Sequence, residues 1–502
     1  MTPQYYKNTL QPVDLDKEAL LDTLAKLQTS IRHGIELIQT ECPPPDPREE
    51  RGPGTVYNGS LGIAHMFLRL ERQTPYITGE NQPPLPNLQM LADFYNSQHQ
   101  LRLGKLSPLG SESLGAPVTR MLTACSSKTT PINHRDITML HEATQAAIDD
   151  GSTPGADEAL FGRVGLLWAI LNLRRCKVDD EGAKAGLNLV FENVQVLVDL
   201  LVDTGKAGAH NYARDNGHQG VLPLMWVWHD RYYLGAIHGV AGILTILLSC
   251  EPNELERDDQ PSHNHLPLIA ETITKLSTLC VSHNGHLPSS LPPRSTSRSS
   301  PLVQICHGTP GLLLLLAKAR RNPHIVSTYW KPEWDEAIKL GTETVWNEGL
   351  LSKGGGLCHG IAGNAWPLLA LHGCYFNSAL EAATLGDNGS QEGSPAPLSA
   401  DDFLAKALAF LLHARETPPF KSDSGPSQQP YRMPDSPYSL FEGLAGTICA
   451  WAEACVVITT RFRKLEKLER GELPRRGDIE KQDEDELGIP GLGGLGQPRG
   501  LL

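Results

Sequence analysis

The chain alternates between apolar runs that follow a glycine and longer stretches with one apolar and one polar face. Each apolar run follows a small or polar residue, a glycine, two further residues and often a second glycine, as in AIHGVAGILTILL at 236–248. Seven copies, of which the second (SLGAPVTRML) is degenerate, are led by Gly59, Gly115, Gly162, Gly239, Gly308, Gly360 and Gly443. A run that is apolar on nearly every side predicts a helix buried among other helices.

The stretches between these copies predict a second, outer layer of helices. Amphipathic patterns with polar faces occur at 15–38, 186–205 and 269–283. Alternating amphipathic and apolar helices are typical of an all-α protein made of repeated helical hairpins. A closed ring of hairpins would bury the inner helices without open ends, but an open solenoid would give the same periodicity. The pattern alone therefore leaves the ring and the solenoid open.

Breaks in this pattern predict the connections and the domain boundary. Connections rich in Pro, Gly and Ser are predicted at 42–54, 287–301, 386–399 and 422–437. The last part of the chain first mixes charges and then becomes Gly-rich. We expect one domain at 1–460 and a tail at 461–502 that is partly disordered.

The composition narrows the class of protein. The 502 residues carry a net charge of −13 and a sequence pI of about 5.8, without the basic footprint that nucleic-acid binding needs. The first residues are polar, unlike a secretory signal. The most apolar stretches, at 232–248 and 311–317, are shorter than the roughly 20 residues that span a bilayer. We expect a cytoplasmic protein with reduced cysteines and no transmembrane segment, for which peripheral contact with membranes stays open.

Three copies of the repeat place a histidine directly before the leading glycine: His238, His307 and His359. Two of them place a cysteine before that histidine, Cys306 and Cys358. Because equivalent positions in a repeat fold lie at equivalent places, these side chains should meet at one end of the inner helices. Thiolate and imidazole are donors that zinc prefers, and two Cys with one His leave a fourth position open, as in catalytic zinc sites. The sequence alone leaves open which of His307 and His359 would bind.

A structural interpretation of these residues competes with the metal site. Buried cysteine is common as a small apolar residue, so a single Cys–His pair favours packing. Two identical C-H-G-x-x-G copies in phase with a repeat favour metal instead. His65 is interpreted as a core or rim residue, and Arg163 as a packing or ion-pair residue. Core positions are predicted for Cys125, Cys176, Cys250, Cys280, Cys374, Cys449 and Cys455.

The repeat motifs resemble those of the lanthionine synthetase C-like (LanC-like) family, the eukaryotic relatives of bacterial lantibiotic cyclases. The matching pieces are LFGRVG, AIHGVAG, ICHGTPG, KGGGLCHGIAGN and SLFEGLAGT, and the similarity runs from about Gly59 to Ala454. The most specific part of the match is the sequence CHG, which occurs twice and is followed by GN after the second copy. Together with Lys353, this pattern resembles the eukaryotic type of the family. The resemblance implies a toroid of seven inner and seven outer helices.

The resemblance also implies a role for each residue of the Cys–His motifs. It implies that Cys306, Cys358 and His359 are zinc ligands. It implies that His307 lies beside the metal without binding it, or acts in acid–base chemistry. His238 matches the active-site histidine of the family.

Further residues are carried over from the family with departures. Glu158, four residues before Gly162, stands where relatives often have an acidic active-site residue. Lys353 matches a lysine that helps to bind glutathione. Relatives often carry an arginine near the N-terminus that contacts glutathione, and Gln4 stands there in this chain. The departure at Gln4 weakens the expectation that glutathione binds.

These parts predict a reaction. Zinc in an open Cys–Cys–His site deprotonates a bound thiol, and the thiolate is the nucleophile. The thiolate would add to dehydroalanine or dehydrobutyrine, and His238 or His307 would supply a proton to the α-carbon. Glutathione is the expected co-substrate, and proteins or peptides with dehydroamino acids are the expected partners. The alternatives are a zinc- and glutathione-binding scaffold or sensor without catalysis, and a purely structural zinc.

Overall fold

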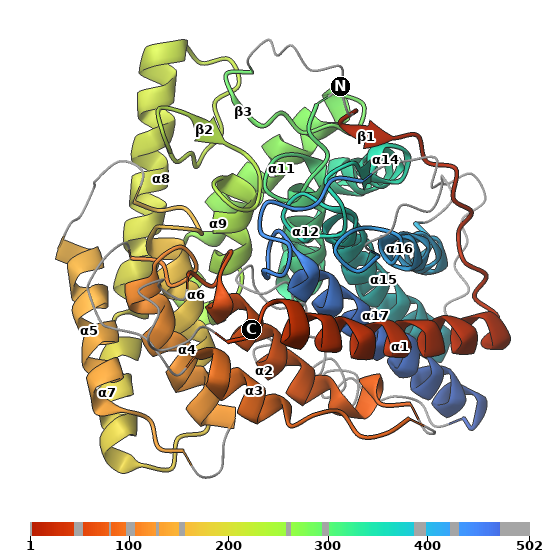
Figure 1. Cartoon of the computed structure of the whole chain (residues 1–502). Helices are drawn as coiled ribbons and strands as arrows, with labels where there is room; N and C mark the ends of the chain where they lie inside the picture. Colours follow the sequence, from red (N-terminus) through yellow and green to blue (C-terminus); the bar gives the residue numbers. More distant parts are fainter. Residues whose placement is uncertain are drawn as a thin grey trace.

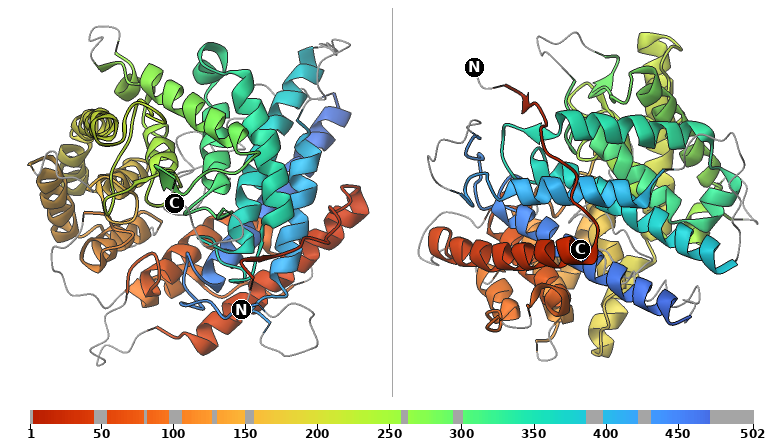
Figure 2. Two further views of the ribbon diagram at one scale, coloured as in Figure 1. Left: turned by 90° about the horizontal axis from the view of Figure 1, so that it is seen from above. Right: turned by 90° about the vertical axis from the view of Figure 1, so that its right-hand side faces the viewer.

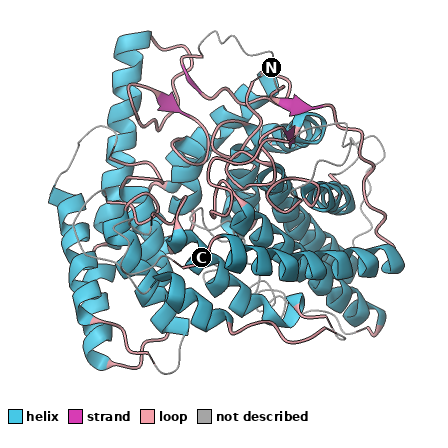
Figure 3. Ribbon diagram, in the orientation of Figure 1, coloured by secondary structure: helices cyan, strands magenta, loops and turns pink. Residues whose placement is uncertain are grey.

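Helices make up nearly all of the regular structure of the chain (Figure 3). The computed structural model describes residues 3–44, 54–79, 82–96, 106–126, 130–149, 156–257, 263–293, 301–385, 398–421 and 431–471. Figure 1 shows the elements, with α8 upright at the left and α1 across the front. Seen from above, the helices surround a common centre (Figure 2).

The apolar runs form an inner layer of helices. In the described residues these are α2 (Ser60–Ile77), α4 (Glu112–Ser126), α6 (Arg163–Arg174), α9 (Val240–Leu247), α12 (Thr309–Arg320), α15 (Ile361–Leu385) and α17 (Leu444–Glu469). Each packs against the next in this order, and α17 packs against α2. The inner helices therefore close into a ring, which excludes the open solenoid.

The amphipathic stretches form the outer layer. These helices are α1 (Lys17–Glu41), α3 (Leu88–Asn96), α5 (His134–Asp149), α8 (Val194–Asn216), α11 (Leu266–Ser282), α14 (Pro332–Glu348) and α16 (Ala400–Ala414). The described part of the chain also contains α7 (Glu181–Phe191), α10 (Pro252–Leu255) and α13 (Pro323–Thr328). The predicted stretch 186–205 is not one helix, because it breaks between Phe191 and Val194.

The glycines of the repeat have two separate tasks. The leading glycine is the residue before the inner helix, as Gly239 is for α9. The second glycine lies in the first turn, where a Cβ on Gly242 would be 1.8 Å from the Ala236 carbonyl oxygen. Gly115 was predicted to lead its copy and so to precede an inner helix. That prediction is wrong, because α4 begins at Glu112 and Gly115 lies inside it. A Cβ there would meet the Pro108 carbonyl oxygen at 2.7 Å, so Gly115 corresponds to the second glycine of the repeat.

A circle of backbone hydrogen bonds joins the turns that precede the inner helices. The N–H groups donate to carbonyl oxygens over 2.7 to 3.3 Å as follows: Tyr57 to Leu109, Ser107 to Phe161, Ala159 to Ile237, Ala236 to Ile305, Cys306 to Cys358, Cys358 to Phe441, and Phe441 to Tyr57. We call this set the turn circle. It satisfies buried backbone groups in turns that have no sheet of their own, and it fixes the spacing between neighbouring turns.

Strands are few and short among the described residues. β1 (Tyr5–Tyr6) pairs with β4 (Leu350–Leu351), and β2 (Tyr232–Tyr233) pairs with β3 (Ser290–Leu291), both antiparallel. The first pair attaches the N-terminal segment beside the turn before α15. The second pair supports the turn before α9.

The C-terminal helix passes through the predicted domain boundary at residue 461. α17 continues to Glu469, and Arg461 and Lys464 are buried in it. The Arg461 guanidinium donates to Asp401 over 2.7 Å, which ties this end of α17 to α16. The rest of the predicted tail, residues 472–502, lies outside the described residues, as do large parts of the four predicted connections.

Two helical stretches are long and apolar enough to cross a membrane when judged by length and composition alone: Glu181–Asn216 and α17. In α17 almost the whole apolar window is buried inside the protein, as in the core helix of a globular fold. Neither stretch establishes a membrane span, and the absence of a transmembrane segment stays a prediction.

Candidate metal centre and active site

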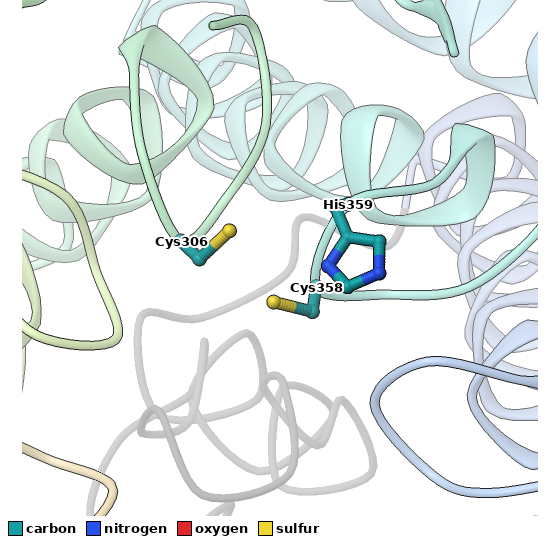
Figure 4. Close-up of side chains that lie close together, drawn as sticks. All are labelled: Cys306, Cys358 and His359. Carbon is teal, nitrogen blue, oxygen red and sulfur yellow. The ribbon is translucent and has the colours of Figure 1, made fainter. Parts of the chain in front are cut away.

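Two turns of the inner ring bring the predicted metal ligands together. Cys306 lies before α12, and Cys358 and His359 lie before α15. The two sulfur atoms and a nitrogen of His359 all lie within 4.8 Å of one another. Figure 4 shows both sulfur atoms directed into the space between the two turns, with the His359 ring beside Cys358. The bond from Cys306 N to the Cys358 carbonyl oxygen, 3.3 Å long, belongs to the turn circle and holds the two turns at this spacing.

The chemistry of the three donors fits a divalent cation. Burial raises the pKa of Cys306, but hydrogen bonds with Cys358 and Gln304 and the charge of Lys353 outweigh it and lower the pKa overall. The hydrogen bond with Cys306, burial and the Cys306 charge hold the pKa of Cys358 well above its usual range. The two buried thiols therefore interact directly, and a cation bound between them would displace their protons. Two thiolates and one imidazole are a donor set typical of zinc with a fourth position left for a substrate.

Each cysteine sulfur accepts a hydrogen bond from an uncharged side chain. The Tyr57 hydroxyl donates to Cys358 Sγ over 2.9 Å, and Gln304 Nε2 donates to Cys306 Sγ over 3.0 Å. Burial and the neighbouring sulfur atoms hold the pKa of Tyr57 well above its usual value, so the hydroxyl keeps its proton. Such donors orient metal ligands and reduce the negative charge on sulfur.

Neither donor is predicted from the sequence, although the repeat register marks one of them. Tyr57 lies two residues before Gly59, as Cys358 lies two residues before Gly360. In the same register Glu442 takes the position of His359 in the last repeat, and its charge is one cause of the raised pKa of Tyr57. An alignment of the copies on their leading glycines would have found Tyr57 and Glu442.

His238 and Glu158 form a hydrogen-bonded pair at the turns before α9 and α6. His238 Nδ1 is 2.9 Å from Glu158 Oε2. The buried Glu158 carboxylate also accepts hydrogen bonds from the backbone N–H groups of Leu160, at 2.8 Å, and Phe161, at 2.5 Å. A carboxylate held in this way fixes the orientation and tautomer of the imidazole. The bond uses Nδ1, which leaves Nε2 to face a substrate.

Aromatic rings extend the site from His238. The Trp228 ring stacks on the His238 ring with centroids 6.1 Å apart and an angle of 7°, and Phe161 stacks on Trp228 with centroids 5.7 Å apart. The His307 ring lies 6.0 Å from His238 and 5.2 Å from Tyr233. His307 is thus beside both the Cys306 turn and His238. The stack fixes the plane of the His238 ring, whereas Glu158 fixes its rotation.

The N-terminal segment lies next to Lys353. Ser352 N donates to the Gln4 carbonyl oxygen over 3.2 Å, alongside the β1–β4 pair. Lys353 is exposed, and its charge contributes to lowering the pKa of Cys306. The Gln4 side chain donates to the Pro301 carbonyl oxygen over 2.8 Å. The structure therefore places both residues that the resemblance links to glutathione at one edge of the site.

The interpretations of His65 and Arg163 as structural residues agree with their surroundings. His65 is fully buried and its Nε2 lies 3.0 Å from Thr119 Oγ1. Arg163 is also buried and pairs with Asp157 over 2.8 Å. Five of the seven other cysteines predicted as core are buried, but Cys125 and Cys176 are only half-buried at the far ends of α4 and α6.

Comparison with known proteins identifies the family. The family model described as "Lanthionine synthetase C-like protein" matches residues 50–383, more than half of the chain. The chain belongs to the lanthionine synthetase C-like family. The resemblance stated from the motifs is thereby confirmed.

Two curated relatives are eukaryotic, in agreement with the predicted type. "Glutathione S-transferase LANCL1" of Danio rerio is 26% identical over 319 residues, which cover 63% of this chain and 64% of that protein. "LanC-like protein GCL1" of Arabidopsis thaliana is 27% identical over 323 residues, which cover 63% of this chain and 59% of that protein. The chain thus spans less than two thirds of the length of these two relatives.

A solved structure supports the fold. "Nisin cyclase" superposes with a TM-score of 0.50 and 14% sequence identity, covering 88% of this chain and 99% of that chain. Together with the closed inner ring, this similarity confirms the predicted all-α toroid of seven inner and seven outer helices in the described residues.

Proposed function

We propose that the protein forms thioethers by activating a thiol at a zinc ion. Glutathione would be the thiol, and dehydroalanine or dehydrobutyrine residues in proteins or peptides would accept it. The observation that carries the proposal is the convergence of Cys306, Cys358 and a nitrogen of His359 within 4.8 Å of one another, next to the His238–Glu158 pair. When bound, zinc would hold the incoming thiol as its thiolate near neutral pH.

The chain's own residues would prepare the site in two ways. Tyr57 and Gln304 would keep the two ligand sulfur atoms oriented through the hydrogen bonds described above. Their uncharged donors would also draw charge from the sulfur atoms, so that the site attracts a third thiolate more strongly.

A positioned acid completes the addition. The thiol loses its proton, the S–C bond forms at the β-carbon, and the α-carbon gains a proton. His238 is placed to donate that proton from Nε2, since Glu158 occupies Nδ1 and stabilises the imidazolium form. His307, 6.0 Å from His238 between ring centroids, is the second candidate for acid–base work.

Lys353 and the N-terminal segment would bind glutathione. The Lys353 ammonium is exposed at the edge of the site, where it would pair with a glutathione carboxylate. The name of the zebrafish relative, "Glutathione S-transferase LANCL1", agrees with this co-substrate. We keep a cytoplasmic location, with peripheral contact to membranes open, as part of the proposal.

An adduct assay tests the proposal. The zinc-loaded protein is incubated with glutathione and a peptide that contains dehydrobutyrine, and the glutathione adduct is measured by mass spectrometry. We expect an adduct with the wild type and none with Cys306→Ala, which should also lose the zinc ion held by the cysteines. No adduct from a protein that holds its full zinc content would refute the catalytic proposal.

A scaffold that binds zinc and glutathione without catalysis is the second candidate. It is favoured by Gln4, whose side chain is engaged with the Pro301 carbonyl oxygen and offers no guanidinium to a carboxylate. Calorimetry with glutathione, run beside the adduct assay, separates the two functions, because the scaffold predicts binding without adduct. A structural zinc predicts that the spectrum of cobalt in the site does not respond to added thiol.

A further inference from the structure

A second group of metal-binding side chains lies in the outer layer. Asp199 is on α8, and His263 and His265 precede α11. One carboxylate oxygen and one nitrogen from each imidazole all lie within 4.8 Å of one another. These residues share no side chain with the site described above, and the proposed function makes no use of them.

The carboxylate lies between the two imidazoles. Asp199 Oδ1 is 2.6 Å from His265 Nε2, and Asp199 Oδ2 is 3.0 Å from His263 Nδ1. The two imidazole rings are 6.2 Å apart. Two imidazoles on either side of one carboxylate are a ligand set for a divalent cation.

The surrounding structure holds the group in place. His265 is 2% exposed in its side chain, its backbone N–H donates to the Leu255 carbonyl oxygen over 2.8 Å, and it precedes the first turn of α11. Gln195, one turn before Asp199, donates to Asp199 Oδ1 over 3.0 Å. The base of the group is therefore fixed before any ion binds.

Access and charge suit an ion that enters from solvent. The side chains of Asp199 and His263 are 23% and 34% exposed, so one side of the group is open to water. Burial acts to raise the pKa of Asp199, but its contacts with His265, His263 and Gln195 outweigh it and lower the pKa. An ionised carboxylate is the form that binds metal.

We propose that Asp199, His263 and His265 form a second metal site, which binds zinc or a similar divalent transition ion with water in the remaining positions. Its two nitrogens and one oxygen differ from the sulfur-rich group at the centre of the toroid, so the two sites should differ in preference, with softer ions held by the cysteines. An ion here would join α8 to the start of α11. Asp199 and His265, which would bind it, are 66 residues apart in the sequence.

Metal stoichiometry with zinc alone as the probe tests this site. We expect the full chain to hold two zinc ions, and His265→Gln and His263→Ala each to hold one. His263→Ala is included because a half-exposed side chain tolerates truncation even if the buried His265 does not. The matched control is His324→Ala, since His324 also pairs with a carboxylate, Glu256, over 3.0 Å but has no second histidine. The control should keep two ions.

Cobalt absorption separates the two sites in the same variants. Cobalt bound by thiolates shows a sulfur-to-metal charge-transfer band, which should persist in His265→Gln and vanish in Cys306→Ala. A wild type that saturates at one ion and shows this band would overturn the second site. A wild type with one ion, no such band, and loss of that ion in His263→Ala would support the second site while contradicting the proposed function.

Discussion

Each of the two cysteine sulfurs at the centre of the toroid accepts one hydrogen bond from an uncharged side chain. The donors come from different repeats, Tyr57 from the turn before α2 and Gln304 from the turn before α12. Tyr57 connects Cys358 to a turn that contributes no predicted ligand, whereas Gln304 lies in the same turn as Cys306. The properties of the candidate metal site therefore depend on residues outside the CHG motifs.

Removal of the Tyr57 hydroxyl should weaken metal binding while the fold persists. We expect Tyr57→Phe to lower zinc affinity by about 10-fold, because changes to groups that hydrogen-bond metal ligands typically cost that much or more. Zinc affinity is measured by competition with a chromogenic chelator. Tyr329→Phe is the control, since its hydroxyl donates to Glu256 far from the cysteines. Equal affinities in wild type and Tyr57→Phe would contradict the proposed role of the hydroxyl.

Loss of the proposed acid should separate catalysis from metal binding. We expect His238→Asn to reduce adduct formation by about 100-fold or more at unchanged zinc content, since a positioned acid contributes about that much. Glu158→Gln should give a smaller loss, because the Glu158 side chain reaches the reacting atoms only through His238. Mass spectrometry of the adduct measures the rate of adduct formation, and zinc analysis of the same samples measures the zinc content. A rate equal to that of the wild type in His238→Asn would assign the proton transfer to another group.

At the scale of the elements, the second glycine of each repeat decides how closely an inner helix approaches the turn before it. The Cβ of an alanine at Gly363 would lie 1.8 Å from the Leu357 carbonyl oxygen, which belongs to the backbone and cannot rotate away. The same contact recurs at Gly242 with Ala236. The spacing between the two glycines, which recurs in the copies of this chain, is therefore a packing requirement of the ring.

An alanine at one of these glycines should destabilise the protein strongly. We expect Gly242→Ala to lower the free energy of unfolding by about 3 kcal/mol, as for other overpacked core positions. Gly182→Ala in α7 is the control, because its Cβ would meet only side-chain atoms, of His134 at 3.1 Å and Asp180 at 3.3 Å, and alanine favours the helix. Unfolding in urea measures both variants. A similar midpoint for Gly242→Ala and wild type would show that the turn can move aside.

The sequence predicts these elements well where the repeat is regular and poorly where it is not. Apolar runs fixed the inner helices, but the amphipathic stretch 186–205 gave no sign of its break after Phe191. Gly115 was assigned to the wrong glycine of its copy, although SLG at 113–115 matches SLG at 60–62. Gln304 could not be found, since no repeat marks it and only the folded turn brings it to Cys306.

At the scale of the whole molecule, the periodicity of the repeats could not predict whether the ring is closed. Contact between α17 and α2 joins the two ends of the repeat array, and no local pattern encodes it. The second metal group was missed for a similar reason, because His263 and His265 lie far from Asp199 along the chain. Both features depend on contacts between distant segments, whereas the CHG residues were found because the repeat places them in register.

Two buried histidines should make the protein acid-sensitive. Burial and the charges of Arg69 and Arg72 lower the pKa of His65 to about 3, and burial lowers the pKa of His372 to about 4. The unfolded chain takes up these protons near pH 6.5. Above that pH neither state binds them, so stability is unaffected.

As the pH falls from 6.5 toward 4, only the unfolded chain gains the two protons, so stability should fall by up to about 2.7 kcal/mol per pH unit. Urea unfolding at several pH values measures the slope. His372→Gln, which keeps a donor for the Ala400 carbonyl oxygen, should reduce the slope by about half. A slope near zero over this range in the wild type would mean that the histidines are protonated in the folded protein.

The turn circle makes the geometry of the candidate metal site depend on every repeat of the ring. The distance between Cys306 and Cys358 is set by one bond of the circle, and that bond is held by the six others. Damage to any repeat, even one on the opposite side from the cysteines, should therefore widen the gap between the two sulfur atoms. Release of the ion would report such damage before the helices themselves unfold.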